Sequence, residues 1–205
     1  MKGLIGTKIG MTSIFGDQGQ IIPCTVIEAG PCVVTQIKSK AKDGYDAVQI
    51  GYGTKKEKNT TKALKGHFEK AQTAPKSKLV EFRGTFDVEL GAVVSTDILK
   101  EGDKISISAN SKGKGFQGVV KRHNFSGVGG QTHGQHNRLR SPGSIGACST
   151  PSRVFKGMKM GGRMGNETVK LPGSKIIKII PEQNYIIVKG SVPGHNGAIV
   201  VLEKK

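Results

Sequence analysis

Three histidines in the middle of this sequence are the side chains best suited to holding a metal ion. His123, His133 and His136 lie close together, and the last two are three residues apart. The segment from Ser111 to Gly165 around them offers no carboxylate and only Cys148 as a further ligand, and its ten Lys and Arg residues oppose a divalent cation. We therefore predict neither a metal site nor a cofactor.

The serines and glycines of the same segment match catalytic motifs only in part. Ser141, Ser144 and Ser149 have histidines nearby, but no acidic residue of the segment could orient one as a base. Residues 113–118 read GKGFQG and match GxGxxG, yet a dinucleotide site needs an acid about 20 residues later and none precedes Glu167. The HRD and DFG motifs of kinases are also missing. We predict that the chain is not an enzyme and has no small-molecule substrate.

The dominant feature of the segment is its positive charge. It has 13 Gly among 55 residues, and its apolar residues are single or in short clusters, so little hydrophobic surface offsets charge repulsion and glycine entropy. A solvated loop is one interpretation of such a run. Half of the cations are Arg, whose planar fork suits phosphate, and they are spread evenly, which favours a nucleic acid. Aromatic residues are scarce (5%), which indicates contact with the backbone of folded RNA.

The candidate RNA-binding residues are these basic side chains, with histidines that can stack or donate and one serine. They are Lys112, Lys114, Lys121, Arg122, His123, His133, His136, Arg138, Arg140, Ser144, Arg153, Lys156, Lys159 and Arg163. The charged runs at 55–58 and 203–205 are expected to be ordinary solvated surface.

Composition supports the same partner. The 205 residues carry a formal net charge of +17, which points to nucleic acid or to an anionic membrane surface. No run of eighteen apolar residues and no secretory signal is present, so we expect no membrane contact. Cys24 and Cys32 lie in apolar contexts typical of reduced core residues, which predicts a reducing, intracellular compartment.

Outside the basic segment, short β-branched runs alternate with turn signals, a pattern typical of a barrel or a sandwich. A short helix is expected over 61–74, ended by Pro75. The simplest architecture is a mainly β barrel with 111–165 as a long excursion between two of its strands. The predicted strands are 4–15, 21–27, 32–37, 45–52, 78–82, 104–109, 175–180, 185–189 and 198–202.

Several long motifs resemble a known family. They are GLIGTKIGMTSIF at 3–15, FQGVVKRHNFSG at 116–127, THG at 132–134, SPGSIG at 141–146 and VFKGMKMGGRMGNE at 154–167. Together they are similar, nearly end to end, to the bacterial form of ribosomal protein three of the large subunit.

The resemblance implies a fold and a function. The fold is a closed six-stranded β-barrel of the translation-protein type, residues 1–110 and 166–205, with a small helical insertion at about 54–82. Residues 111–165 are then a basic Gly-rich extension that penetrates large-subunit rRNA toward the peptidyl transferase centre, with 142–151 nearest to it. The family binds near the 3′ end of that rRNA, acts early in subunit assembly, and contacts neighbouring ribosomal proteins in the cytoplasm. A non-ribosomal RNA chaperone, or a general nucleic-acid-binding protein, is the alternative.

One departure from the family concerns the tip of the extension. Many bacterial members carry glutamines after the SIG motif, one of them methylated in some species, whereas this chain has Ala147, Cys148 and Ser149. The resemblance therefore implies a tip with no glutamine to modify and with more room beside the RNA.

Overall fold

The computed structural model describes residues 3–16, 18–130 and 133–204, so Thr132 of the THG motif and Lys205 of the C-terminal charged run lie outside the described residues. The chain divides into two compact units. Unit 1 comprises Met1–Ser111 and Thr168–Lys205, and unit 2 comprises Lys112–Glu167. Each is described by itself.

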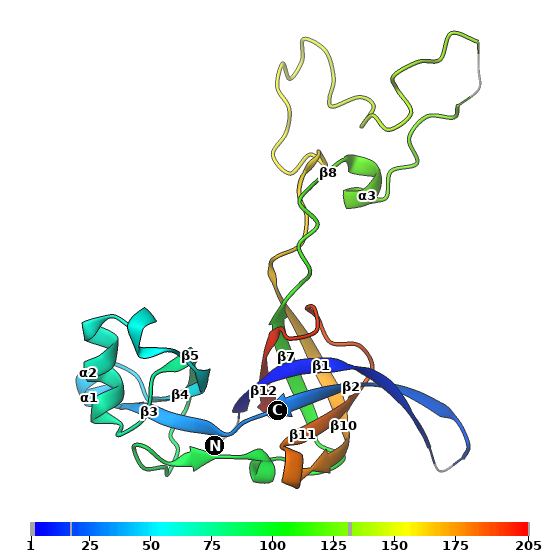
Figure 1. Ribbon diagram of the computed structural model, residues 1–205. Helices are drawn as coiled ribbons and strands as arrows, with labels where there is room; N and C mark the ends of the chain where they lie inside the picture. The colour runs from blue at the N-terminus through cyan, green and yellow to red at the C-terminus, as the bar shows by residue number, and fades with distance from the viewer. Residues whose placement is uncertain (1–2, 17, 131–132, 205) are drawn as a thin grey trace. The chain divides into compact units, whose positions relative to one another are not determined.

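Unit 1 contains a closed antiparallel barrel (Figure 1). Its strands are β1 (Gly3–Phe15), β2 (Ile21–Ala29), β7 (Lys104–Asn110), β10 (Thr168–Ile180), β11 (Tyr185–Lys189) and β12 (Ile199–Lys204). Their order around the barrel is β1-β12-β7-β10-β11-β2. Where the barrel is closed, every strand has a neighbour on both sides, so no free strand edge can pair with another chain. The prediction of a mainly β protein with a closed six-stranded barrel is confirmed.

The barrel is held together by apolar side chains on the inward face of each strand. Ile105 and Ile107 of β7 are fully buried, as are Leu4, Ile27 and Leu202 on other strands. Burying each such side chain contributes about 1.5–3 kcal/mol. The β-branched residues that predicted these strands thus also form the core.

A second sheet belongs to the same unit. Its strands are β3 (Cys32–Lys38), β4 (Ala47–Thr54), β5 (Lys76–Arg83) and β6 (Val93–Val94), in the order β5-β4-β3-β6. The helical segments beside them are α1 (Lys40–Asp43), η1 (Glu57–Asn59), α2 (Lys62–Lys70) and η2 (Thr96–Ile98). The insertion predicted at 54–82 therefore contains a strand as well as a helix, and it belongs to a sheet that the sequence did not separate from the barrel.

The two sheets of unit 1 share one hydrophobic core. Phe82 of β5 and Val34 of β3 pack in the same cluster as Leu4 and Ile107 of the barrel. Tyr52 of β4 hydrogen-bonds through its hydroxyl to Thr7 Oγ1 of β1, at 3.0 Å. Cys32 donates from Sγ to the Ile5 carbonyl at 3.4 Å, and burial raises the pKa of its thiol to about 11. Cys24 and Cys32 are buried free thiols, as predicted.

Two element boundaries differ from the sequence prediction by four residues or more. Helix α2 ends at Lys70, well before Pro75, because Gln72 adopts a left-handed conformation with φ of 51°. Strand β10 begins at Thr168, seven residues before its predicted start. The Pro172-Gly173 pair reads as a strand breaker, but the register of β10 against β7 shifts between Leu171 and Ser174, and this irregularity absorbs the pair.

Two glycines of β1 allow a test of barrel packing. A Cβ at Gly6 would lie 2.4 Å from the Glu28 backbone oxygen, whereas a Cβ at Gly10 would meet nothing within 4 Å. We expect Gly6→Ala to lower the free energy of unfolding by about 1–3 kcal/mol, because β2 must move away. Gly10→Ala, on the same strand, should change it little. Urea unfolding followed by circular dichroism measures both, and equal effects would contradict the close contact of β1 and β2.

Candidate nucleic-acid interface

The basic segment leaves and rejoins the barrel strands at paired residues. Strand β7 ends at Asn110 and β10 begins at Thr168, and these two residues are register partners. Thr168 Oγ1 donates to Asn110 Oδ1 at 2.9 Å. The chain between them, residues 111–167, therefore begins and ends at neighbouring positions of one sheet.

Unit 2 begins as a narrow antiparallel stem. Strand β8 (Phe116–Gln117) pairs with β9 (Gly162–Arg163), and the Lys114 amide donates to the Met164 carbonyl at 2.9 Å. The Met164 amide donates to the Gly115 carbonyl at 3.0 Å. Figure 1 shows these two halves of the stem, green and gold, side by side. Backbone hydrogen bonds thus define the stem, since Phe116 is 79% exposed.

A short helix, α3 (Val119–His123), follows β8 and is fastened to the opposite half of the stem. Arg122 Nη1 donates to the Met160 carbonyl at 2.9 Å, and His123 Nε2 contacts the same oxygen at 3.0 Å. The ring nitrogen must donate there, because a carbonyl only accepts. The sequence did not identify Met160 as a partner of these side chains, since a carbonyl acceptor leaves no signal in residue type.

The charges of unit 2 face outward. All ten of its Lys and Arg residues between 111 and 165 are exposed, as are His133, His136 and Ser144, while His123 is partly buried. Because this segment contains no acidic residue, it offers them no carboxylate. The stem and α3 carry Lys112, Lys114, Lys121, Arg122, His123 and Arg163, and the other eight predicted residues lie in the loops between. The structure thus divides the predicted residues into two groups.

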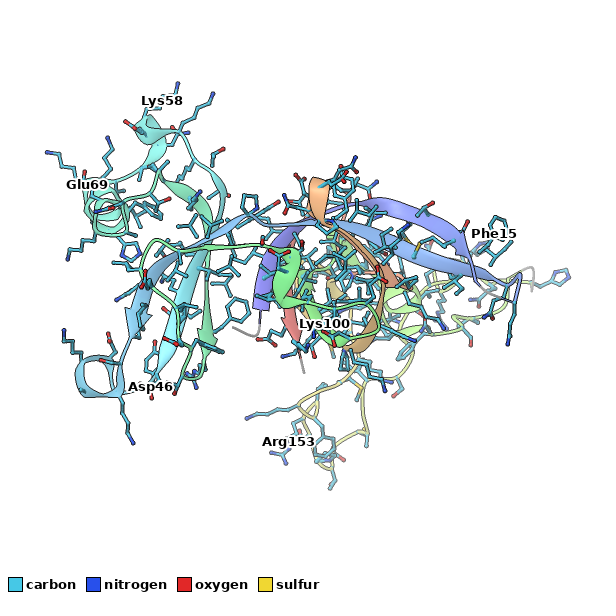
Figure 2. The ribbon with its side chains drawn as sticks, turned by 90° about the horizontal axis from the view of Figure 1, so that it is seen from below. Phe15, Asp46, Lys58, Glu69, Lys100 and Arg153 are labelled. Carbon is cyan, nitrogen blue, oxygen red and sulfur yellow. The ribbon has the colours of Figure 1, made fainter. Side chains whose placement is uncertain are left out.

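The loops of unit 2 have almost no hydrophobic core. Among the described residues of this unit, Val119 is the one buried large apolar side chain, while Leu139, Phe155 and Met158 are 39–55% exposed. Arg153 (Figure 2) makes a cation–π contact at the surface. Its guanidinium lies 5.3 Å from the centre of the Phe155 ring. An open hollow of about 360 Å³ is lined by residues 124–128 and 141–143. These loops expose charge, ring faces and backbone and do not pack them against each other.

Other kinds of site have little support in the described residues. Across 3–16, 18–130 and 133–204, no three His, Cys, Asp or Glu residues gather as metal ligands would. In the same ranges, no helix has the length and apolar character needed to span a membrane.

Comparisons with known proteins agree with these features. The family description "Ribosomal protein L3" matches residues 77–205, which include all of unit 2. The protein described as "Large ribosomal subunit protein uL3" from Salinibacter ruber (strain DSM 13855 / M31) is 56% identical to this chain over 206 residues. That similarity covers 100% of this chain and 99% of the relative.

Two glycines with similar backbone conformations allow a test of the stem. Gly165 has φ of +72° and its Cβ would lie 2.1 Å from the Lys112 carbonyl oxygen, whereas Gly157 has φ of +83° and open space around it. We expect Gly165→Ala to remove the protection of the Lys114 and Met164 amides from hydrogen exchange, because the clash opens the stem. Gly157→Ala carries the same backbone strain and should leave these amides protected. Loss of protection in both variants would show that strain alone, and not the close approach, explains the effect.

Proposed function

Because this chain belongs to the ribosomal protein L3 family, and is thus a structural protein of the large ribosomal subunit, we propose that it binds the rRNA of that subunit through unit 2. Binding takes place near the 3′ end of the rRNA and early in subunit assembly. Residues 111–165 extend along the RNA toward the peptidyl transferase centre.

One observation carries this proposal: ten exposed cations lie on a unit with a short stem and almost no core. Like charges at this density repel, and little apolar contact within unit 2 opposes the repulsion. An RNA backbone supplies the missing negative charge and releases its counterions when the Lys and Arg residues bind. The partner therefore both neutralises and orders the loops.

The two groups of basic residues have different roles in this proposal. Arg122 donates to Met160 with one nitrogen and keeps the other guanidinium donors for phosphate, so it joins the stem to the RNA. His123 donates to the same carbonyl oxygen through Nε2 and keeps its ring face for the RNA. The loop residues, from His133 to Lys159, follow the RNA backbone farther from the stem, where no fixed geometry limits them.

Residues 142–151 lie nearest to the catalytic RNA in this proposal. Ala147, Cys148 and Ser149 are all exposed and small, and Ser144 Oγ donates to the Gly146 carbonyl at 3.0 Å, which folds the tip on itself. Small side chains leave room for an RNA surface to approach the backbone. The tip acts through shape and backbone donors, because it offers no glutamine amide.

The protein itself performs no catalysis, needs no cofactor and works in the cytoplasm, with neighbouring ribosomal proteins as further partners. Residues 1–110 and 166–205 fold as a barrel domain without RNA, and 111–165 becomes ordered on binding. A general RNA chaperone would share the charge and the loops but would bind bulk RNA as tightly as large-subunit rRNA. Competition between the two RNAs separates these functions.

Binding through phosphates predicts a steep dependence on salt. The association constant for large-subunit rRNA should fall by about 0.7–0.9 log units per contact for each tenfold rise in salt concentration. Filter binding of the full-length protein across a salt series measures the slope. A flat response would contradict binding through the exposed cations.

The tip can be tested by deletion of residues 143–149. Unit 1 packs its core without these residues, so the thermal midpoint of its unfolding should stay unchanged. Subunit maturation, or sensitivity to inhibitors of peptidyl transfer, should change. A variant with a Gly-Ser segment of equal length separates the loss of the tip side chains from the shortening of the loop. Loss of barrel folding would contradict the proposed division into domains.

A further inference from the structure

A second lysine-rich surface lies in unit 1, between residues 55 and 78. This stretch has eight Lys and two Glu, a net charge of +6, and no Arg. The lysines are Lys55, Lys56, Lys58, Lys62, Lys65, Lys70, Lys76 and Lys78. From the sequence, residues 55–58 are predicted to be ordinary solvated surface. Figure 2 shows Lys58 of the turn η1 and Glu69 of the helix α2 at the same end of the second sheet.

Buried and exposed residues lie on different sides of helix α2. Phe68 is buried, as is Ala71, which follows the last turn, and Leu64 is partly buried one turn earlier. Lys62 and Lys70 are exposed, on the side of the helix that the 3.6-residue period places away from Phe68. Lys65, three residues before Phe68, lies at the border of the two faces and is partly exposed. We call Lys58, Lys62, Lys65 and Lys70 the lysine face.

The lysine face is not neutralised within the protein. Among the described residues, the ion pairs are Lys38–Glu81, Lys170–Glu203 and Lys204–Asp103, and none of them uses a lysine of 55–78. The two glutamates of the stretch, Glu57 and Glu69, can offset at most two of its eight charges. The excess charge is therefore directed at solvent or at a partner.

A glycine in the middle of this helix is the second observation. Gly66 lies between Lys62 and Lys70, and a Cβ there would meet nothing within 4 Å. Glycine disfavours a helix interior more than any residue except proline, so the fold gains nothing from Gly66. A bare backbone among lysines allows another backbone to approach closely.

Residue types on this surface distinguish RNA from a protein partner. None of the large exposed hydrophobic side chains lies within 55–78, all of which the structure describes. Protein interfaces are depleted in Lys and usually centre on buried aromatic or Met anchors. Lysines around an open backbone instead suit phosphates, which a flexible point charge can meet without fixed geometry.

We propose that the lysine face binds the phosphate backbone of large-subunit rRNA at a second place, separate from unit 2. This inference rests on the proposed function, since it takes the same RNA as partner. Lysines without arginine or aromatic residues position the RNA and do not read its bases. Unit 1 then takes part directly in RNA binding, in addition to anchoring the two ends of the basic segment.

The charge of the lysine face is tested with K62Q/K65Q/K70Q in the full-length protein. Three lost phosphate contacts should make the plot of log association constant against log salt shallower by about 2 to 3 units, with in vitro transcribed large-subunit rRNA as the probe. The matched control is K100Q/K104Q/K178Q, which removes the same charge from exposed lysines elsewhere in unit 1. The slope of its plot should change by less than the amount expected for the loss of one phosphate contact.

Gly66→Ala tests the open backbone without changing charge. A methyl group at this position should raise the thermal midpoint, because Ala is the better helix residue. The same variant should bind rRNA at least threefold more weakly, because the phosphate backbone is held farther from the helix. A structural role for Gly66 would instead lower the midpoint, and unchanged RNA affinity would overturn its role in contact.

The outcomes separate this inference from the proposed function. Wild-type protein that fails to bind large-subunit rRNA would overturn the proposed function and this inference together. Wild-type binding with equal slopes for the two triple variants would overturn the lysine face alone. Normal rRNA binding by K62Q/K65Q/K70Q, combined with poor incorporation into subunits, would show a protein partner and would also overturn it.

Discussion

Electrostatic repulsion within residues 111–165 limits how far this part of the chain can fold by itself. Ten cations without one carboxylate cannot approach each other closely, and little apolar surface is available to compensate. In the described residues of unit 2, regular secondary structure is limited to a short stem and one helical turn, with Arg122 and His123 bound to a single carbonyl oxygen. Such a segment needs fixed ends, and the pairing of Asn110 with Thr168 supplies them.

Unit 1 has a more balanced charge, since it contains 14 of the 15 acidic residues. It also contains 22 of the 32 Lys and Arg residues, so its formal net charge is +8. Some of these charges are paired closely: Lys204 holds the pKa of Asp103 below its usual value, and Lys38 does the same for Glu81. This near balance of charge is compatible with a compact core. The uniform positive charge of residues 111–165 is not.

The sequence predicted those features that depend on local patterns. Alternating β-branched residues gave most strand positions and the barrel, and long motifs gave the family, which the comparisons confirm. The second sheet was not separated from the barrel, because strands in both sheets have the same residue pattern and sheet membership depends on distant pairs such as Val48 with Phe82. The start of β10 was missed because Pro172-Gly173 resembles a turn. The RNA-binding residues stay a prediction, since charge and exposure describe a surface without showing its ligand.

The glycines of this chain show how a fold requirement can be told from a partner requirement. Gly6 needs the absence of a side chain because the backbone of β2 lies against it, and Gly165 needs it both for the close Lys112 carbonyl and for a left-handed φ. Gly66 meets neither condition, and yet it occupies a helix interior where it is costly. A destabilising residue that no internal contact explains points outward. Gly66 lies among lysines that form no ion pair with any described residue. This position favours a polyanion as the partner, because a polyanion gains from both the charge and the open backbone.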